Sequence, residues 1–191
     1  MKLRNILLFL ALVIITAGCI KLTNERSVQS NIYKALSIGQ NKFLLINRSK
    51  VEKVVEIKME EYVDFGRFVS FESDNTEDLV PKNIKVLDDK ISGLNISFDL
   101  SENLLSTLDN VSLVDVRTFE EYSEGHIKNS QLLPLDTLTY NAEKKLKKEN
   151  LIILYCRSGN RSGQAQKYLE KLGYTSLNAG GINSYKGEIV R

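Results

Sequence analysis

The most informative segment of the sequence is Leu151-Ile152-Ile153-Leu154-Tyr155-Cys156-Arg157-Ser158-Gly159-Asn160-Arg161-Ser162. Its first five residues form an apolar run, which predicts a strand buried on both faces in a parallel sheet. After the polar loop, apolar residues recur at helical spacing up to Gly173, which predicts a helix that ends there. The order of strand, tight loop and helix therefore predicts an α/β domain, with a second central strand at Ser112-Leu113-Val114-Asp115-Val116.

The thiol of Cys156 follows the predicted strand directly, where the loop leads into the helix. Unpaired N–H groups and the positive end of the helix dipole favour an anion at such a point. Arg157 and Arg161 add positive charge, and Gly159 permits a backbone in which several amides point inward. Such surroundings lower a cysteine pKa from about 8.5 toward roughly 3.5–7.5. We therefore expect Cys156 to be a thiolate nucleophile suited to transfer chemistry on an oxyanion-bearing substrate.

Short strands are predicted before this domain. Apolar residues alternate with polar ones in Val55-Glu56-Ile57-Lys58-Met59 and in Leu94-Asn95-Ile96-Ser97-Phe98. Alternation with period two is typical of strands that bury one face. We therefore predict a small all-β domain, a β-sandwich or a curled sheet, over residues 31–99. The α/β domain would follow over residues 100–191.

The N-terminus has the pattern of a targeting segment. Two basic residues precede an apolar run at 6–15, which is too short to span a bilayer comfortably. The following Thr16-Ala17-Gly18-Cys19 resembles the lipobox of bacterial lipoproteins. That resemblance implies that residues 1–18 are removed and that a lipid on Cys19 anchors the protein to a membrane on the periplasmic or cell-surface side. The polar residues 19–30 would form a linker. The alternatives are an uncleaved anchor helix, or an ordinary secretory signal with Cys19 incidental.

Composition excludes several classes of function. The chain has 191 residues, of which 42% are hydrophobic, so global disorder is excluded. Lys and Arg number 26 against 24 Asp and Glu, with no long basic block, so we expect no nucleic-acid partner. Two cysteines and one histidine supply neither a tetrahedral zinc site without added carboxylates nor a disulfide framework. We therefore expect no metal site and no cofactor.

Five motifs in the last ninety residues occur in an order that resembles a single-domain rhodanese over about residues 101–191. The motifs are Asp115-Val116-Arg117-Thr118, Glu120-Glu121-Tyr122, Glu124-Gly125-His126-Ile127, the stretch from Tyr155 to Ser162, and Gly180-Gly181. The resemblance implies a five-stranded parallel sheet flanked by helices. It also implies a sulfurtransferase, in which a cysteine accepts sulfane sulfur from thiosulfate or a similar small donor and passes it to a thiol or to cyanide.

The same resemblance implies a role for each matching residue. Cys156 would be the nucleophile and persulfide carrier, and Arg157 and Arg161 would help to hold an anionic donor. The sulfur would be cradled by the backbone amides of Arg157, Ser158, Gly159, Asn160 and Arg161. Three further residues would support the site: Asp115 and Arg117 as an internal ion pair, and His126 as a hydrogen-bonding strut.

Two other functions are alternatives to the sulfurtransferase. Cysteine phosphatases and arsenate reductases of related fold place five residues between Cys and Arg, whereas four lie between Cys156 and Arg161. The tighter ring favours a single sulfur atom over a phosphate-like group. A non-catalytic surface module that binds a partner or senses sulfur is the other alternative, and the presence of Cys156 argues against it. Because a lipid-modified Cys19 could not resolve a persulfide, we expect an external thiol acceptor or a thioredoxin-like reductant.

Overall fold

The computed structural model describes residues 31–48, 50–56, 66–74, 81–87 and 91–191. The predicted signal segment, the linker and Cys19 lie outside the described residues, as does the strand prediction at 57–59. Within the part of the chain that the structure describes, no helix combines the length and hydrophobicity needed to cross a bilayer.

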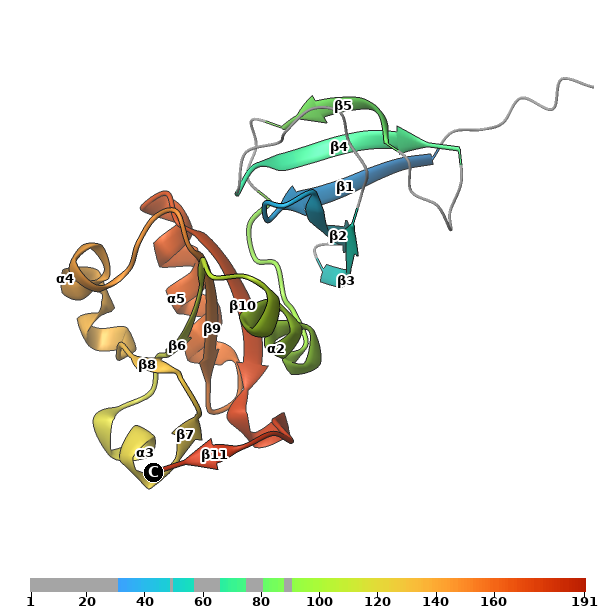
Figure 1. Cartoon of the computed structure of the whole chain (residues 1–191). Helices are drawn as coiled ribbons and strands as arrows, with labels where there is room; N and C mark the ends of the chain where they lie inside the picture. Colours follow the sequence, from blue (N-terminus) through green and yellow to red (C-terminus); the bar gives the residue numbers. More distant parts are fainter. Residues whose placement is uncertain (1–30, 49, 57–65, 75–80, 88–90) are drawn as a thin grey trace, which may run out of the picture.

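The N-terminal region forms one antiparallel sheet with the strand order β3-β2-β1-β4-β5 (Figure 1). Its strands are β1 (Asn31–Ser37), β2 (Lys42–Asn47), β3 (Lys50–Glu56), β4 (Phe68–Ser73) and β5 (Lys82–Val86). The all-β prediction for this region is confirmed. Among the described residues this region forms a single five-stranded sheet, so the two sheets of a β-sandwich are not observed within it.

The C-terminal domain is built on a parallel sheet with the strand order β10-β9-β6-β8, which confirms the predicted α/β class. Its strands are β6 (Val111–Asp115), β8 (Gln131–Leu132), β9 (Leu151–Cys156) and β10 (Thr175–Gly181). Helix α2 (Phe98–Thr107) covers one face of the sheet, and α4 (Leu135–Lys145) and α5 (Asn160–Lys171) cover the other (Figure 1).

The remaining elements gather at the carboxyl end of the parallel sheet (Figure 1). They are α3 (Phe119–Glu124), the short 3-10 helix η1 (Ile182–Ser184) and a two-stranded pair made of β7 (His126–Ile127) and β11 (Ile189–Val190). These elements surround the point at which β9 ends, so they can contribute side chains to a site there.

Strand β9 is the centre of the fold, and all six of its residues are buried. Because successive side chains of a strand point to opposite faces, Ile153 and Tyr155 join the apolar cluster beneath α2. Ile152, Leu154 and Cys156 join the cluster beneath α4 and α5. The alternation thus places the thiol on the α5 side of the sheet.

The segment Leu94–Phe98, predicted as a strand, differs from that prediction. It makes only an isolated pairing at Asn95, which bridges to Asn178 of β10 on one side and to Lys50 of β3 on the other. The pairing ends because Ser97 caps α2, where its hydroxyl accepts the N–H of Leu100. The described parallel sheet therefore has four strands, and this segment occupies the fifth position expected from the resemblance.

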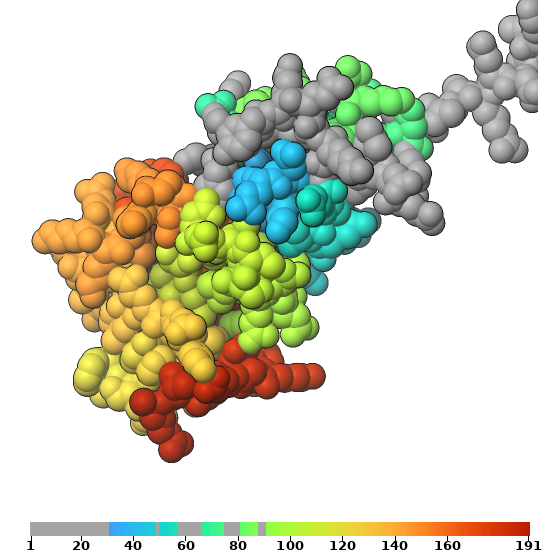
Figure 2. Space-filling model, in the orientation of Figure 1, coloured from blue at the N-terminus to red at the C-terminus, as the bar shows by residue number. Residues whose placement is uncertain are grey.

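The two sheets share one apolar core. Leu36, Leu44 and Phe68 of the N-terminal sheet lie in the same buried cluster as Ile96 and Leu104 of the C-terminal domain. Figure 2 shows the blue and cyan surface of the N-terminal strands directly beside the yellow-green surface that follows it in the chain. The N-terminal sheet therefore packs on the α2 side of the parallel sheet, away from the face that carries Cys156.

Candidate active site

Cys156 is the last residue of β9 and is 1% exposed. The loop that follows turns sharply at Gly159, which adopts a φ of +99° directly before α5. This left-handed conformation favours glycine, because a side chain at such a φ is strained. The turn carries the chain back over the sulfur, so that the first N–H groups of α5 lie close to it.

Backbone N–H groups converge on the sulfur. The Gly159 N–H donates to Sγ at an N–S distance of 3.1 Å, and the nearby N–H groups of Ser158 and Ser162 also favour the charged form of the sulfur. The Ser162 hydroxyl is 3.5 Å away. Burial raises the pKa of Cys156, but these hydrogen bonds outweigh burial and bring the pKa below the usual value of a cysteine. The loop therefore favours the thiolate.

The end of β10 fits closely against this loop. A Cβ atom at Gly181 would lie 2.5 Å from the carbonyl oxygen of Arg157 and 2.7 Å from the Cα of Ser158. Both neighbours are backbone atoms, so no side-chain movement could relieve the contact. This close approach gives a physical reason for glycine at the second position of Gly180-Gly181.

Arg161 is paired with a carboxylate that has no role in the sequence prediction. Its two terminal nitrogens donate to Glu121 of α3 at 2.5 and 2.7 Å. These hydrogen bonds are the main reason why the pKa of Glu121 falls to about 2. The Arg161 guanidinium also interacts with the Cys156 sulfur. Sequence offers one signal for Glu121, because it closes a capping box with Thr118 at the start of α3.

The remaining loop residues differ in their surroundings. Arg157 is exposed, and its guanidinium makes no hydrogen bond or ion pair with any described residue. Ser158 contributes its N–H to the sulfur while its side chain is exposed, and the exposed Asn160 begins α5. Among the two loop arginines, Arg157 is thus the one whose charge is unpaired in the described structure.

Asp115 and Arg117 form the internal ion pair expected from the resemblance. Both are buried, with Arg117 Nη2 2.7 Å from Asp115 Oδ2, and Arg117 also donates to the carbonyl of Gly125 at 2.7 Å. His126 Nδ1–H donates to the carbonyl of Tyr122 at 3.0 Å, and the two rings stack with centroids 3.7 Å apart. These contacts hold α3 and its flanks, and α3 carries Glu121.

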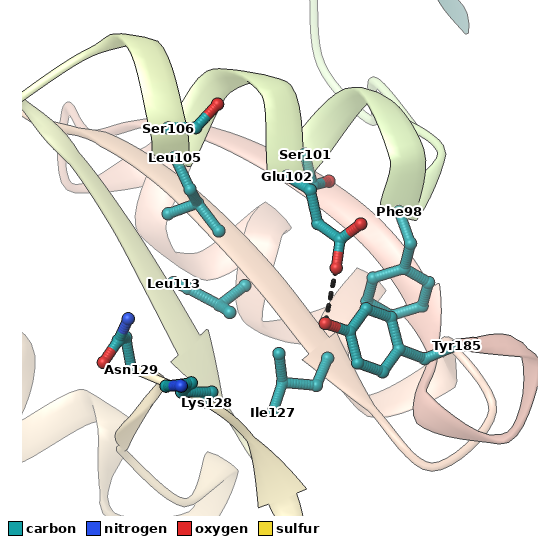
Figure 3. Close-up of a pocket in the computed structure, with 10 residues that line it drawn as sticks. All are labelled: Phe98, Ser101, Glu102, Leu105, Ser106, Leu113, Ile127, Lys128, Asn129 and Tyr185. Carbon is teal, nitrogen blue, oxygen red and sulfur yellow. Dashed lines mark hydrogen bonds between the residues drawn. The ribbon is translucent and has the colours of Figure 1, made fainter. Parts of the chain in front are cut away.

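A separate pocket of about 270 Å³ lies on the opposite face of the sheet from the thiol (Figure 3). Its apolar lining includes Phe98, Ile127 and Tyr185, and the Tyr185 hydroxyl donates to Glu102 at 2.5 Å. Because these residues belong to the α2 side, the pocket does not open onto Cys156. The described residues also contain no group of three or more His, Cys, Asp or Glu side chains that could hold a metal ion.

Comparison with known proteins gives similarity in the C-terminal half. Residues 99–188 match the family model for the rhodanese-like domain. A sulfurtransferase of Allochromatium vinosum is 36% identical over 94 residues, which are 49% of this chain and 81% of that protein. Thiosulfate sulfurtransferase PspE of Escherichia coli is 34% identical over 71 residues, 36% of this chain and 68% of that protein.

Two further similarities differ in how much of the other protein they cover. The adenylyltransferase and sulfurtransferase uba4 of Ogataea parapolymorpha is 38% identical over 79 residues, and the match spans only 20% of that protein. The crystal structure of a rhodanese-like domain protein from Staphylococcus aureus is 34% identical, with 49% of this chain and 92% of that chain covered at a TM-score of 0.45.

Proposed function

Because this chain belongs to the rhodanese-like family through residues 99–188, we propose that it is a sulfurtransferase that moves a sulfane sulfur atom by way of Cys156. Thiosulfate or a similar small anion is the donor, and a thiol or cyanide is the acceptor. The observation that carries the proposal is the buried thiol held among the N–H groups of Ser158, Gly159 and Ser162. This arrangement favours an anionic sulfur, which is the nucleophilic form.

The transfer occurs in two displacements at sulfur. The Cys156 thiolate attacks the outer sulfur of thiosulfate, a new S–S bond forms, and sulfite leaves with the electron pair of the broken S–S bond. The acceptor thiolate then attacks the outer sulfur of the Cys156 persulfide. That step returns Cys156 to the thiolate and leaves the acceptor as a persulfide, or cyanide as thiocyanate. N–H donors that stabilise a sulfur anion serve in both steps.

The two loop arginines take different parts in this proposal. The unpaired, exposed charge of Arg157 attracts an anionic donor to the mouth of the site. The charge of Arg161 is largely offset by Glu121, so Arg161 holds the loop in place beside the sulfur.

An assay of thiocyanate formation from thiosulfate and cyanide tests the proposal. The wild-type chain should turn over, and Cys156→Ser should not. A second assay with an aryl phosphate separates the phosphatase alternative, which four residues between Cys156 and Arg161 disfavour. Hydrolysis of the phosphate without thiocyanate formation would contradict the sulfurtransferase.

The physiological acceptor is external to the chain in this proposal. Among the described residues, Cys156 is the free cysteine. A small thiol or a thioredoxin-like protein therefore receives the sulfur. Sulfide release from thiosulfate should depend on added thiol when cyanide is absent, and release at the same rate without thiol would exclude this acceptor scheme.

We further propose that the protein is a membrane-anchored lipoprotein on the extracytoplasmic side. The support is the sequence Thr16-Ala17-Gly18-Cys19 after a short apolar run. Cleavage before Cys19 and lipidation of its thiol would anchor the folded part through the linker at 19–30. Metabolic labelling with a fatty acid tests this, because label should enter the wild type and should be absent from Cys19→Ala.

A further inference from the structure

Asn178 of β10 binds the surroundings of Cys156 through its side chain. Its Oδ1 accepts the Ser162 hydroxyl at 2.7 Å and the Gly180 N–H at 2.9 Å. Its Nδ2 donates to the carbonyl of Gly159 at 3.2 Å. Two of these partners belong to the turn that surrounds the sulfur, and the third is the first glycine of the β10 end that packs on that turn.

The main chain of Asn178 is bound to the segment that joins the two sheets. Its N–H donates to the carbonyl of Leu94 at 3.1 Å, and its carbonyl accepts the N–H of Ile96 at 2.9 Å. Between them, the carbonyl of Asn95 accepts the N–H of Val51 in β3 at 3.0 Å. A continuous path of hydrogen bonds therefore runs from the N-terminal sheet to Asn178, and from Asn178 to the loop.

The joining segment is also tied to α5, the helix that begins at the active-site loop. The amide of Gln166 donates to the carbonyls of Leu94 at 2.8 Å and Ser176 at 2.9 Å, and this side chain is 1% exposed. The Gly93 N–H donates to Glu170 at 3.1 Å. Since β10, α5 and β3 all hold the segment, the backbone that carries Asn178 is firmly placed.

We propose that Asn178 is a positioning residue for Cys156, which holds the active-site loop on its side chain while the docked N-terminal sheet fixes its main chain. The inference rests on the proposed role of Cys156 as the nucleophile. Asn178 acts through Gly159 and Ser162, which contact the sulfur with an N–H group and a hydroxyl group respectively.

Asn178 affects the orientation of the loop donors that hydrogen-bond to the Cys156 sulfur. An N–H group stabilises a thiolate only while its hydrogen points at the sulfur, since a hydrogen bond weakens steeply when it bends. Without the Asn178 amide, the Gly159 carbonyl keeps the Gly163 N–H at 3.0 Å, but it loses its link to β10. The turn then moves more freely, and the thiolate is less favoured.

A competing effect of Asn178 has the opposite sign. The Ser162 hydroxyl has one hydrogen, and its oxygen is 2.7 Å from Asn178 Oδ1 but 3.5 Å from Cys156 Sγ. If Asn178 acted only as a competitor for that hydrogen, its removal would take away the nearest acceptor and leave the sulfur to compete with the carbonyls of Gly159 and Gly180 alone. The thiolate would then become more favoured, so the direction of the change separates the two roles.

The test is the pH dependence of the alkylation of Cys156 by iodoacetamide in the full chain, with the modified peptide quantified by mass spectrometry so that Cys19 does not contribute. In Asn178→Ala the midpoint of the pH dependence, the pH at which the alkylation rate is half of its maximum, should rise by about one unit. Alkylation of the variant should then be about tenfold slower than that of the wild type at a pH below the midpoints of the two proteins. Asn178→Leu fills the same space without hydrogen bonds and should show the same rise if the alanine variant does not fold.

The matched control is Asn150→Ala. Asn150 also makes a side-chain hydrogen bond, to Ser112 at 2.8 Å, but it directly precedes β9, whereas Cys156 ends that strand. Its midpoint should equal that of the wild type even if its melting temperature falls. A folded Asn178 variant whose midpoint is unchanged or lower would overturn the proposal. Because alkylation needs no sulfur donor, a chain that fails to transfer sulfur but shows the rise would refute the proposed function alone.

Discussion

At the scale of single residues, the ionisation of Cys156 depends on two opposed effects. Burial disfavours the charged form, and the hydrogen bonds of Ser158, Gly159 and Ser162 favour it more strongly. His126 Nδ1–H donates instead to the carbonyl of Tyr122, a contact that supports the flank of α3. The loop itself therefore favours the thiolate, and a thiolate needs no separate general base in the proposed transfer.

The pairing of Glu121 with Arg161 makes stability depend on pH. The pKa of Glu121 is about 2 in the folded chain against an ordinary 4.5, so the pair stabilises the fold fully above about pH 4.5 and loses this effect as the pH falls through 2. Glu121→Gln should lower the free energy of unfolding by about 1–2 kcal/mol at neutral pH, discounted for partial exposure. Urea denaturation of both proteins across this pH range measures the difference.

The control for this prediction is Glu124→Gln, which removes an exposed carboxylate from the same helix without touching Arg161. Its stability should stay near that of the wild type at neutral pH. If the difference in the free energy of unfolding between the wild type and Glu121→Gln remained constant down to pH 2, the ion pair would not be the cause of that difference.

The role of each arginine could be predicted only in part. Sequence places Arg157 and Arg161 beside the thiol with equal charge, and the loop motif gives no reason to separate them. The structure separates them because α3, forty residues earlier in the chain, brings Glu121 onto Arg161. Contacts between residues so distant in sequence depend on packing, which residue spacing does not encode.

At the scale of elements, the contact between β10 and the active-site loop sets how closely the two can approach. Gly181 has a φ of −109°, which any residue adopts, so Gly181→Ala costs only the contact with the backbone of Arg157 and Ser158. Overpacking of this kind costs about 1–3 kcal/mol. Thermal denaturation should show the loss, and sulfur transfer should fall because the displaced loop carries the donors to Cys156.

Gly163→Ala is the matched control for Gly181→Ala. Gly163 lies inside α5, and a Cβ there would meet its nearest neighbour, the Asn178 amide, at 3.4 Å, an ordinary contact. Alanine is the better helix former by about 1 kcal/mol, so this variant should be as stable as the wild type or more stable. Equal losses from both substitutions would rule out the close approach at Gly181 as the cause.

The sequence predicts β9 more reliably than the segment Leu94–Phe98. The apolar run at β9 predicts a central parallel strand, because a half-buried strand would alternate polar and apolar residues and a buried helix would be longer. The alternation in Leu94–Phe98 predicts a strand as well, yet Phe98 starts α2 and only Asn95 pairs. Ser97 decides between the two, since a serine just before an acidic first turn caps a helix as readily as it faces outward from a strand.

At the scale of the whole molecule, the shared core makes the two sheets depend on each other. Leu44 of β2 is fully buried in the cluster that includes Leu104 of α2. Leu44→Ala should therefore cost about 2–5 kcal/mol and lower the hydrogen-exchange protection of β9 as well as β2. The exposed Ile84→Ala on β5 should change neither. Unchanged protection in β9 would mean that the two sheets unfold independently.

The sequence indicates an N-terminal β region and a C-terminal α/β region more readily than it indicates how these two regions contact each other. A change from alternating to continuous apolar runs separates the N-terminal sheet from the α/β domain. The joining segment at 94–96, however, pairs with both sheets at once. The hydrophobic pattern of a segment does not show that it pairs with two different sheets. The hydrogen-bonded path from β3 to the active-site loop therefore could not be predicted from the sequence.

Intact-mass analysis of the full chain after treatment with thiosulfate tests whether Cys156 carries a sulfur atom. The wild type should gain the mass of one sulfur atom and lose it again on addition of cyanide, whereas Cys156→Ser should gain nothing. A wild type that takes up no sulfur, or a Cys156→Ser variant that takes up as much as the wild type, would show that Cys156 is not the sulfur carrier.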